Sequence, residues 1–135
     1  MPERLRAIFA HARALAGAGN LKEAAARYGD AVAKARAFQL SGEFAFALRH
    51  QAECMIGMGE GKAAYETALE AAAIYDRMEP QRGLNYANCA RLVALSLEMI
   101  DRREEALAYW NAARDIFDLH GVGKNVAECD ARLAR

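Results

Sequence analysis

The feature that most constrains how this chain can fold is an internal repeat. Ala24, Ala64 and Ala106 occupy the same place in three similar blocks, so the period is 40 residues and then 42. The blocks agree again four and seven residues further on. The matching residues are Tyr28, Ala68 and Trp110 at the first of these positions, and Ala31, Ala71 and Ala113 at the second. A period of this length indicates a stack of similar supersecondary units.

Composition indicates which kind of unit is stacked. Alanine accounts for 32 of the 135 residues, whereas valine, isoleucine and threonine together number ten. Alanine is the best helix former, and β-branched residues are the ones that strands favour. The chain is also long enough for one domain with a substantial core. We therefore expect a single all-α domain.

Glycine and proline divide the chain into helices. Apolar residues recur at helical spacing, and this pattern breaks at Gly17–Gly19, at Gly57–Gly59 and around Pro80. Glycine is costly inside a helix, and proline cannot continue a helix interior. These breaks predict helix pairs over about residues 3–38, 41–78 and 83–120, and a capping helix over about residues 123–135.

Local patterns predict how individual helices begin. Asn20 followed by Glu23 is typical of a capping pair for the second helix, and Ser41 is a plausible N-cap for the third. The pattern Gly-x-Asn-x-Ala-x-Cys occurs at residues 83–89 and again at residues 123–129. The last helix is therefore expected to be the first helix of an incomplete fourth repeat, and to cap the open end of the stack.

These residues resemble the tetratricopeptide repeat (TPR) family, in a longer-period variety of about 40–42 residues. The resemblance is carried by small residues in the first helices (Ala12, Ala52, Ala94), by turn glycines (Gly19, Gly59) and by the second-helix triplet described above. The departures are a period longer than the usual 34 residues, Ile8, Leu48 and Ala90 in place of an early aromatic, and Asp101 in place of the third turn glycine. The resemblance implies a right-handed superhelical stack of three antiparallel helix pairs plus a C-terminal capping helix, which is a TPR-like α-solenoid.

No constellation of side chains indicates an enzyme or a cofactor site. His11, His50 and His120 lack metal-ligand spacing, since a metal site assembles three or four ligands. His50 and Glu53 lie one helical turn apart, which is more typical of a surface or groove pair than of an acid–base pair. The glycines at 121 and 123 are too close together for a phosphate loop and follow no strand. We expect no catalytic activity, no metal and no cofactor.

The balance of charges indicates the class of partner, and the cysteines indicate the cellular compartment. Eighteen basic residues balance eighteen acidic ones, which disfavours a generic nucleic-acid binder. Cys54, Cys89 and Cys129 are odd in number and form no Cys-x-x-Cys pair, so we expect reduced, buried thiols in a cytoplasmic protein. His11 and Arg13 interrupt the apolar run near the N-terminus, unlike a signal peptide, and no stretch approaches the ~18 apolar residues of a membrane span.

The resemblance also implies a partner-binding surface. In this family the first helix of each pair lines a concave groove, and this architecture uses such surfaces for recognition. Carried across residue by residue, the groove consists of Arg6, Phe9, Arg13, Phe46, Arg49, His50, Glu53, Asn88, Arg91, Leu92 and Leu95. Four arginines against one central carboxylate favour an acidic segment of a partner protein or peptide, with Phe9 and Phe46 in apolar contact.

Other interpretations remain open. The groove arginines could be solvated or paired with Glu53 and Glu98, and exposed pairs of that kind contribute little. The protein could be a structural or homo-oligomerising subunit whose last helix docks on a second copy in a two-fold dimer. A regulator that binds a small ligand or nucleic acid is the third alternative.

Overall fold

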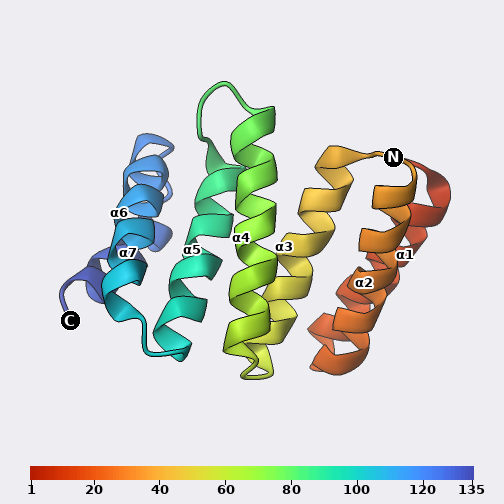
Figure 1. Cartoon of the computed structure of the whole chain (residues 1–135), viewed down its shortest axis with the longest axis horizontal. Helices are drawn as coiled ribbons and strands as arrows, with labels where there is room; N and C mark the ends of the chain where they lie inside the picture. The colour runs from red at the N-terminus through yellow and green to blue at the C-terminus, as the bar shows by residue number, and fades with distance from the viewer.

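The computed structural model describes the whole chain, residues 1–135, and consists of helices joined by turns (Figure 1). The helices are α1 (Glu3–Gly17), α2 (Leu21–Ala37), α3 (Ser41–Gly57), α4 (Gly61–Met78), α5 (Leu84–Met99), α6 (Arg103–Leu119) and α7 (Gly123–Leu133). No strand is present, and no helix is both long and apolar enough to cross a membrane. The predicted all-α class is confirmed, as is the expectation of seven helices.

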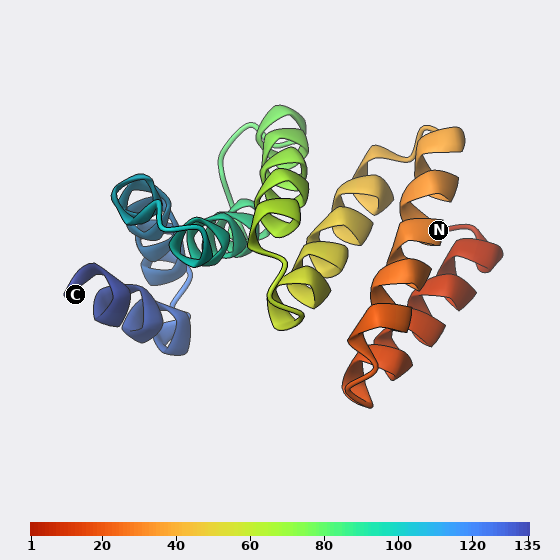
Figure 2. The ribbon, with the colours of Figure 1, turned by 60° about the horizontal axis from the view of Figure 1, so that its bottom comes forward.

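The helices stand beside one another in chain order, so the molecule is an elongated row with its termini at opposite ends (Figure 1, Figure 2). Each helix packs against the next one along the chain, from α1 against α2 to α6 against α7. In addition, α3 contacts α5, which brings the first helices of these two pairs to one face of the row. This is the face on which the partner-binding residues were predicted.

Small side chains let the helices pack closely. All nine residues of the repeated triplet are buried, and Ala24, Ala64 and Ala106 are completely inaccessible to solvent. Alanine at a contact allows two helix backbones to approach, because ridges then fit grooves at a short interaxial distance. Trp110, a member of the triplet in the third pair, is also fully buried. These burials match the packing positions that the repeat predicts.

Five of the six connections end the preceding helix in the same way. The residues with left-handed backbone are Gly19, Gln39, Gly59, Asp101 and Gly121, with φ from 57° to 81°. At the first turn, the amide of Gly19 donates to the carbonyl of Ala16 (3.0 Å) and that of Asn20 to Leu15 (2.9 Å), which is a Schellman motif. Aspartate tolerates this conformation better than most residues. Asp101 can therefore replace the glycine of the earlier turns.

The predicted capping side chains do not cap. Asn20 stands at the N-cap of α2 but makes no side-chain hydrogen bond there, and Glu23 does not complete a capping pair. Ser41 is the first residue of α3, and Leu40 takes the N-cap position. The preceding turn holds Asn20 at ψ 69° and Leu40 at ψ 84°. A capping side chain normally requires a more extended backbone, so the turn geometry overrides the local sequence preference.

The three cysteines are free and buried, which confirms the prediction of unpaired thiols. Burial raises the pKa of Cys89 to about 12 and that of Cys129 to about 11. The thiolate is the reactive form of cysteine, so both thiols are inert in the folded protein at neutral pH.

Candidate partner-binding face

The predicted binding residues lie on α1, α3 and α5, and they differ widely in exposure. Arg6, Arg13 and Glu53 are exposed. Phe46, Arg49, His50, Asn88, Arg91 and Leu95 are partly buried. Phe9 is only 7% exposed and Leu92 only 2%, because helix packing covers both. The expectation that Phe9 and Leu92 offer contact area to a partner is corrected accordingly, and we call the other nine residues the candidate face.

The same contact position recurs between α1 and α3, between α3 and α5, and between α5 and α7. The repeat makes three residue pairs equivalent, because each joins a first helix to the next one at the same register. These pairs are Phe9 with Phe46, Arg49 with Asn88, and Arg91 with Glu128. The chemistry at the three positions differs, and the differences determine which part of the candidate face is available to a ligand.

The pair between α1 and α3 belongs to an aromatic cluster. The ring of Phe9 meets that of Phe46 edge-on, with 5.1 Å between centroids. His50 lies 4.4 Å from Phe46 and stacks on Tyr28 at 5.4 Å. Edge-to-face and stacked rings at these distances attract one another in addition to burying apolar area. The cluster fixes the relative position of α1, α2 and α3.

His50 is neutral in this setting. Burial lowers its pKa to about 4, and the positive charges of Arg49 and Arg13 act in the same direction. The Nδ1 atom of His50 lies 3.9 Å from Oε2 of Glu53. Because the imidazole is uncharged at neutral pH, this contact is not an ion pair. The neutral ring therefore does not attract the Glu53 carboxylate as a positive charge would.

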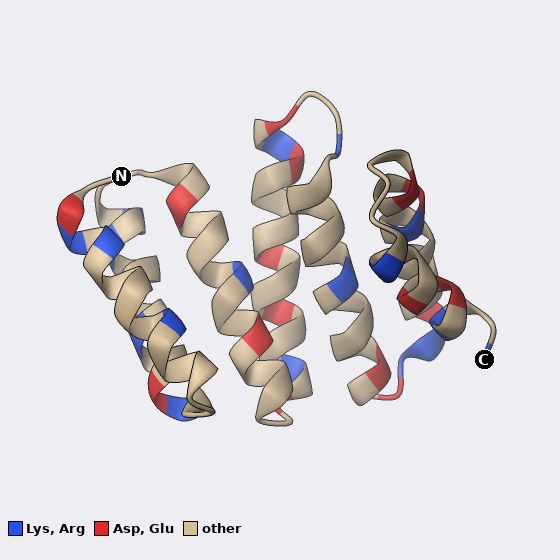
Figure 3. Ribbon diagram, turned by 180° about the vertical axis from the view of Figure 1, so that it is seen from behind, with Lys and Arg blue, Asp and Glu red and all other residues tan.

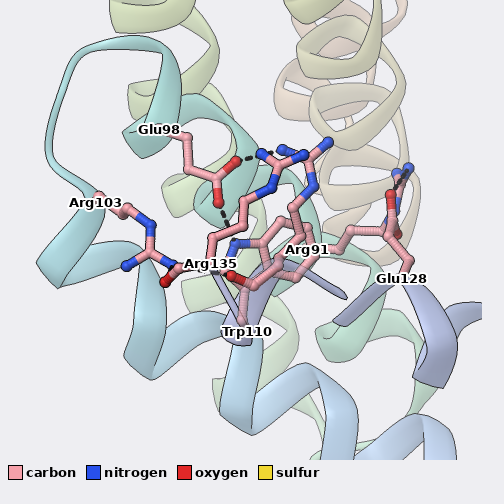
Figure 4. A network of polar contacts seen from close by, with 7 residues as sticks. Arg91, Glu98, Arg103, Trp110, Glu128 and Arg135 are labelled. Carbon is pink, nitrogen blue, oxygen red and sulfur yellow. Dashed lines mark hydrogen bonds and ion pairs between the residues drawn. The ribbon is translucent and has the colours of Figure 1, made fainter. Parts of the chain in front are cut away.

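The pair between α5 and α7 is a bidentate ion pair (Figure 4). Arg91 donates from Nε to Oε1 of Glu128 at 2.5 Å and from Nη2 to Oε2 at 3.0 Å. Both side chains are about 30% exposed, so the pair is partly shielded from water. Two parallel charge-assisted hydrogen bonds occupy the fork of the guanidinium. Arg91 is therefore already satisfied from within the chain.

Further contacts hold α7 in place (Figure 4). Glu98 accepts a hydrogen bond from Nε1 of the buried Trp110 at 2.9 Å and one from Nη1 of Arg132 at 2.5 Å. Arg103 donates to the carbonyl oxygens of Arg132 (3.1 Å) and Arg135 (2.5 Å). The alternative in which Glu98 pairs with a candidate-face arginine is corrected, because Glu98 is committed to α6 and α7.

The middle pair leaves an arginine without a matching carboxylate. No hydrogen bond joins Arg49 to Asn88, and Nε of Arg49 is shielded from solvent and has no hydrogen-bond partner. The nearest acid is Glu53 on the same helix, with Oε1 at 3.4 Å from Nε. That contact has the distance of an ion pair but lacks the geometry of a hydrogen bond. The alternative in which Arg49 pairs with Glu53 is therefore confirmed, although this pair lacks the two hydrogen bonds that Arg91 makes with Glu128.

The two arginines of α1 are more loosely held. Arg6 donates one hydrogen bond to the carbonyl of Met1 at 3.3 Å. Arg13 is exposed and forms no ion pair or hydrogen bond within the chain. Burial raises the pKa of Tyr28, and the charge of Arg13 opposes that rise. Burial lowers the pKa of His50, and the same charge adds to that effect. Arg13 and Arg49 therefore act on the same region, next to the aromatic cluster.

The acid that satisfies Arg91 was missed by reasoning from the sequence. Glu128 lies on α7 and is equivalent to Asn88 on α5 and Phe46 on α3. The duplicated Gly-x-Asn-x-Ala-x-Cys pattern carried the necessary signal, because it places α7 against α5 as α5 lies against α3. Applying that register to the side chains would have identified the Arg91–Glu128 pair.

The charge of the whole molecule is mixed. Seen from behind, basic and acidic residues are interspersed along the ribbon of the row of helices (Figure 3). No group of three or more His, Cys, Asp or Glu side chains is placed to hold a metal ion.

Comparisons with known proteins bear on the fold alone. No family model matches the chain, and no curated protein does. A crystal structure of a TPR-like protein from Chlorobium tepidum TLS superposes with a TM-score of 0.80, covering 96% of this chain and 92% of that one. The fold is TPR-like. Sequence identity between the two chains is 21%, so the likeness shows the fold alone.

Proposed function

We propose that this TPR-like protein is a non-catalytic scaffold that binds an acidic segment of a partner protein or peptide, with Arg49 as the central contact. The segment lies across α1 and α3 on the candidate face. A scaffold of this kind needs no cofactor and no metal. The proposal also keeps the cytoplasmic location expected from the reduced cysteines.

The observation that carries the proposal is the unsatisfied Nε of Arg49. A buried donor without an acceptor costs about 1–3 kcal/mol, and more if it is charged. Arg91, at the equivalent position, shows how the same side chain is satisfied when a carboxylate comes from the next element, since Glu128 takes both prongs of its fork. Asn88 stands in the corresponding place opposite Arg49, and it offers no carboxylate. Because Nε itself is shielded from solvent, a partner's Asp or Glu binds the part of the Arg49 side chain that remains exposed, which is 21%.

The surroundings of Arg49 suit such a ligand. Arg13 is exposed and unpaired, so a second positive charge lies within electrostatic reach of the same region. Phe46 is partly exposed and provides an apolar edge beside the charge. The α5 end of the face is less suitable, because Arg91 is already bound to Glu128. The proposed site is therefore smaller than the eleven residues predicted from the sequence.

A dimer built through α7 is not part of this proposal. The α7 helix packs on α6 of its own chain, and its Cys129 is fully buried. Val126 and Leu133 pack against the same core. The apolar side of α7 is thus used within the molecule, which removes the reason to expect it to dock on a second copy.

The test is selection from a random peptide library against the wild-type protein, Arg49→Gln and the matched control Arg27→Gln. Arg27 forms an exposed ion pair with Asp30 on α2, outside the candidate face. We expect the wild-type protein to select peptides rich in Asp and Glu whose affinity falls with added salt. Arg49→Gln should weaken them about 10- to 100-fold, the value of a charged hydrogen bond, and Arg27→Gln should not.

Two results would contradict the proposal. One is a set of peptides that bind tightly and carry no excess of acidic residues. The other is acidic peptides that bind Arg49→Gln and wild type equally while both proteins give the same circular dichroism spectrum and urea midpoint.

A further inference from the structure

A pocket lies beside the candidate face. It is formed where the N-terminal end of α3 meets the C-terminal end of α4 and the start of α5, along one edge of the row (Figure 1). Its volume is about 290 Å³, and it is lined by Met1, Gly42, Glu43, Phe46, Tyr75, Met78, Glu79 and Asn85. Ligand sites for drug-sized molecules start at roughly 300 Å³. The pocket is therefore the size for one side chain rather than for a large cofactor.

The charge of the pocket is opposite to that around Arg49. Glu43 and Glu79 both line it, and no lysine or arginine does. Asn85, which also lines the pocket, donates from Nδ2 to Oε2 of Glu79 at 3.4 Å. Phe46, which lines this acidic pocket, also lies about one helical turn before Arg49 on α3.

Glu79 has an unused acceptor. Its Oε1 atom is shielded from solvent and accepts no hydrogen bond, whereas Oε2 has only the long contact with Asn85. Buried carboxylate oxygens in folded proteins are nearly always hydrogen-bonded or paired with a cation. Glu79 as a residue is nevertheless partly exposed, and a donor with a positive charge binds a carboxylate more strongly than a neutral donor does.

The walls of the pocket suit a long cationic side chain. Phe46 and Tyr75 provide aromatic rings, and Met78 provides a flexible thioether. Aromatic faces attract ammonium and guanidinium groups, and lysine and arginine bury their methylene stems against apolar surface. Burial raises the pKa of Tyr75 to about 12, so its phenol stays protonated.

We propose that this pocket receives a lysine or arginine side chain of the partner segment that Arg49 anchors by its carboxylate. This inference rests on the proposed function and adds a second, oppositely charged anchor. The ligand is then an amphoteric segment rather than a purely acidic one. Because the two anchors lie at different points along α3, they also fix the direction in which the segment runs.

The spacing of the two anchors specifies the ligand further. Glu43 and Arg49 are six residues apart on one helix, which corresponds to about 9 Å along its axis. An extended peptide advances ~3.3 Å per residue. The basic and acidic residues of the partner are therefore about two or three positions apart in sequence.

The test uses two small probes and one local signal. Nα-acetyl-lysine amide carries the proposed cation, and Nα-acetyl-norleucine amide has the same stem without the charge. Both are titrated into protein carrying ¹³C-methyl methionine, and the Met78 methyl resonance is followed by NMR. We expect a saturable, salt-sensitive shift of Met78 with the lysine derivative only. Met55 and Met99, which do not line the pocket, serve as internal references.

Variants assign the shift to the carboxylates. Glu79→Gln should weaken binding of the lysine derivative at least about five-fold, and Glu43→Gln provides a second variant if Glu79→Gln disturbs the fold. Glu66→Gln, at an exposed position of α4, is the matched control and should bind normally. An unmoved Met78 signal, an equal shift with norleucine, or unchanged binding in both pocket variants would overturn the inference.

The acidic anchor is measured separately in the same samples. Nα-acetyl-glutamate amide is titrated while the Nε–H resonance of Arg49 is followed. If the Arg49 signal responds and the Met78 signal does not, the pocket does not bind a basic side chain, and the proposed function is unaffected. A response of Met78 alone would leave the pocket and count against the carboxylate site.

Discussion

At the scale of single residues, burial and two neighbouring arginines determine the protonation state of His50. The ring is packed between Phe46 and Tyr28, and two arginines lie close enough to oppose its protonation. A protonated His50 would place a third positive charge beside Arg49 and Arg13. The fold therefore holds the ring neutral, and the two arginines remain the source of positive charge on this part of the face.

This arrangement predicts how stability depends on pH. The pKa of His50 is about 4 in the folded protein and near 6.5 in the unfolded chain. Between these values the unfolded chain binds more protons, so stability falls as the pH drops from 6.5 to 4. After allowance for the 22% exposure of the side chain, we expect the loss to be about 1–2 kcal/mol.

The measurement compares wild type with His50→Phe, which keeps the ring and cannot protonate. Urea melts at pH 7 and pH 4.5 give the free energy of unfolding of each protein. The wild type should lose more stability over this interval than the variant does. Parallel losses in the two proteins would show that other groups account for the whole pH dependence.

At the scale of elements, glycine has two separate tasks in this fold. In the turns it provides left-handed backbone, as at Gly19 and Gly59. At the start of α4 it provides space instead. A Cβ atom on Gly61 would lie 2.9 Å from Cβ of Met99 and 3.0 Å from Cγ2 of Ile100, closer than side chains normally approach. Gly61 therefore sets how closely α4 packs on the end of α5.

We expect Gly61→Ala to destabilise the protein by about 1–3 kcal/mol through overpacking. The clash involves the Cβ of Met99, which cannot move without its backbone. Gly17→Ala is the matched control, because no atom lies within 4 Å of the added methyl group and the residue is helical. That change should be neutral or stabilising by up to about 1 kcal/mol. Urea denaturation measures both, and equal effects would disprove the close approach of α4 to α5.

At the scale of the whole molecule, the core is divided rather than continuous. One buried cluster joins α1, α2 and α3, and a larger one extends from α3 to α7. The α3 helix contributes to both, so it links the two parts of the row. Repeat arrays of this kind gain stability from contacts between neighbours, and their ends open more easily than their centre.

The cysteines report on this division. Cys54 lies in the smaller cluster and Cys89 in the middle of the larger one, whereas Cys129 is the single buried residue of the 11-residue α7. We expect Cys129 to be alkylated first as urea is raised and Cys89 last. Mass spectrometry of N-ethylmaleimide-treated protein measures the three rates. Identical urea dependence at all three sites would indicate one cooperative unit instead.

The periodic features of this protein were predictable from the sequence. Helix type follows from alanine content and apolar spacing, and the triplet at Ala64, Ala68 and Ala71 identifies packing positions because burial repeats with the helical period. The turn at Asp101 was also recognisable by its place in the repeat. These features depend on residues close together in the chain, where a local pattern is sufficient.

Tertiary structure alone decided which charged side chains are satisfied. The same register makes Arg49 and Arg91 equivalent, yet Glu128, 37 residues beyond Arg91, neutralises only one of them. Asn20 has a capping sequence but no capping contact, because the turn before it fixes the backbone first. Long polar side chains reach partners on other helices, so their pairing depends on how those helices dock. Sequence periodicity therefore fixes the helices and their contact faces, while helix docking determines that Arg91 has a bidentate partner and Arg49 does not.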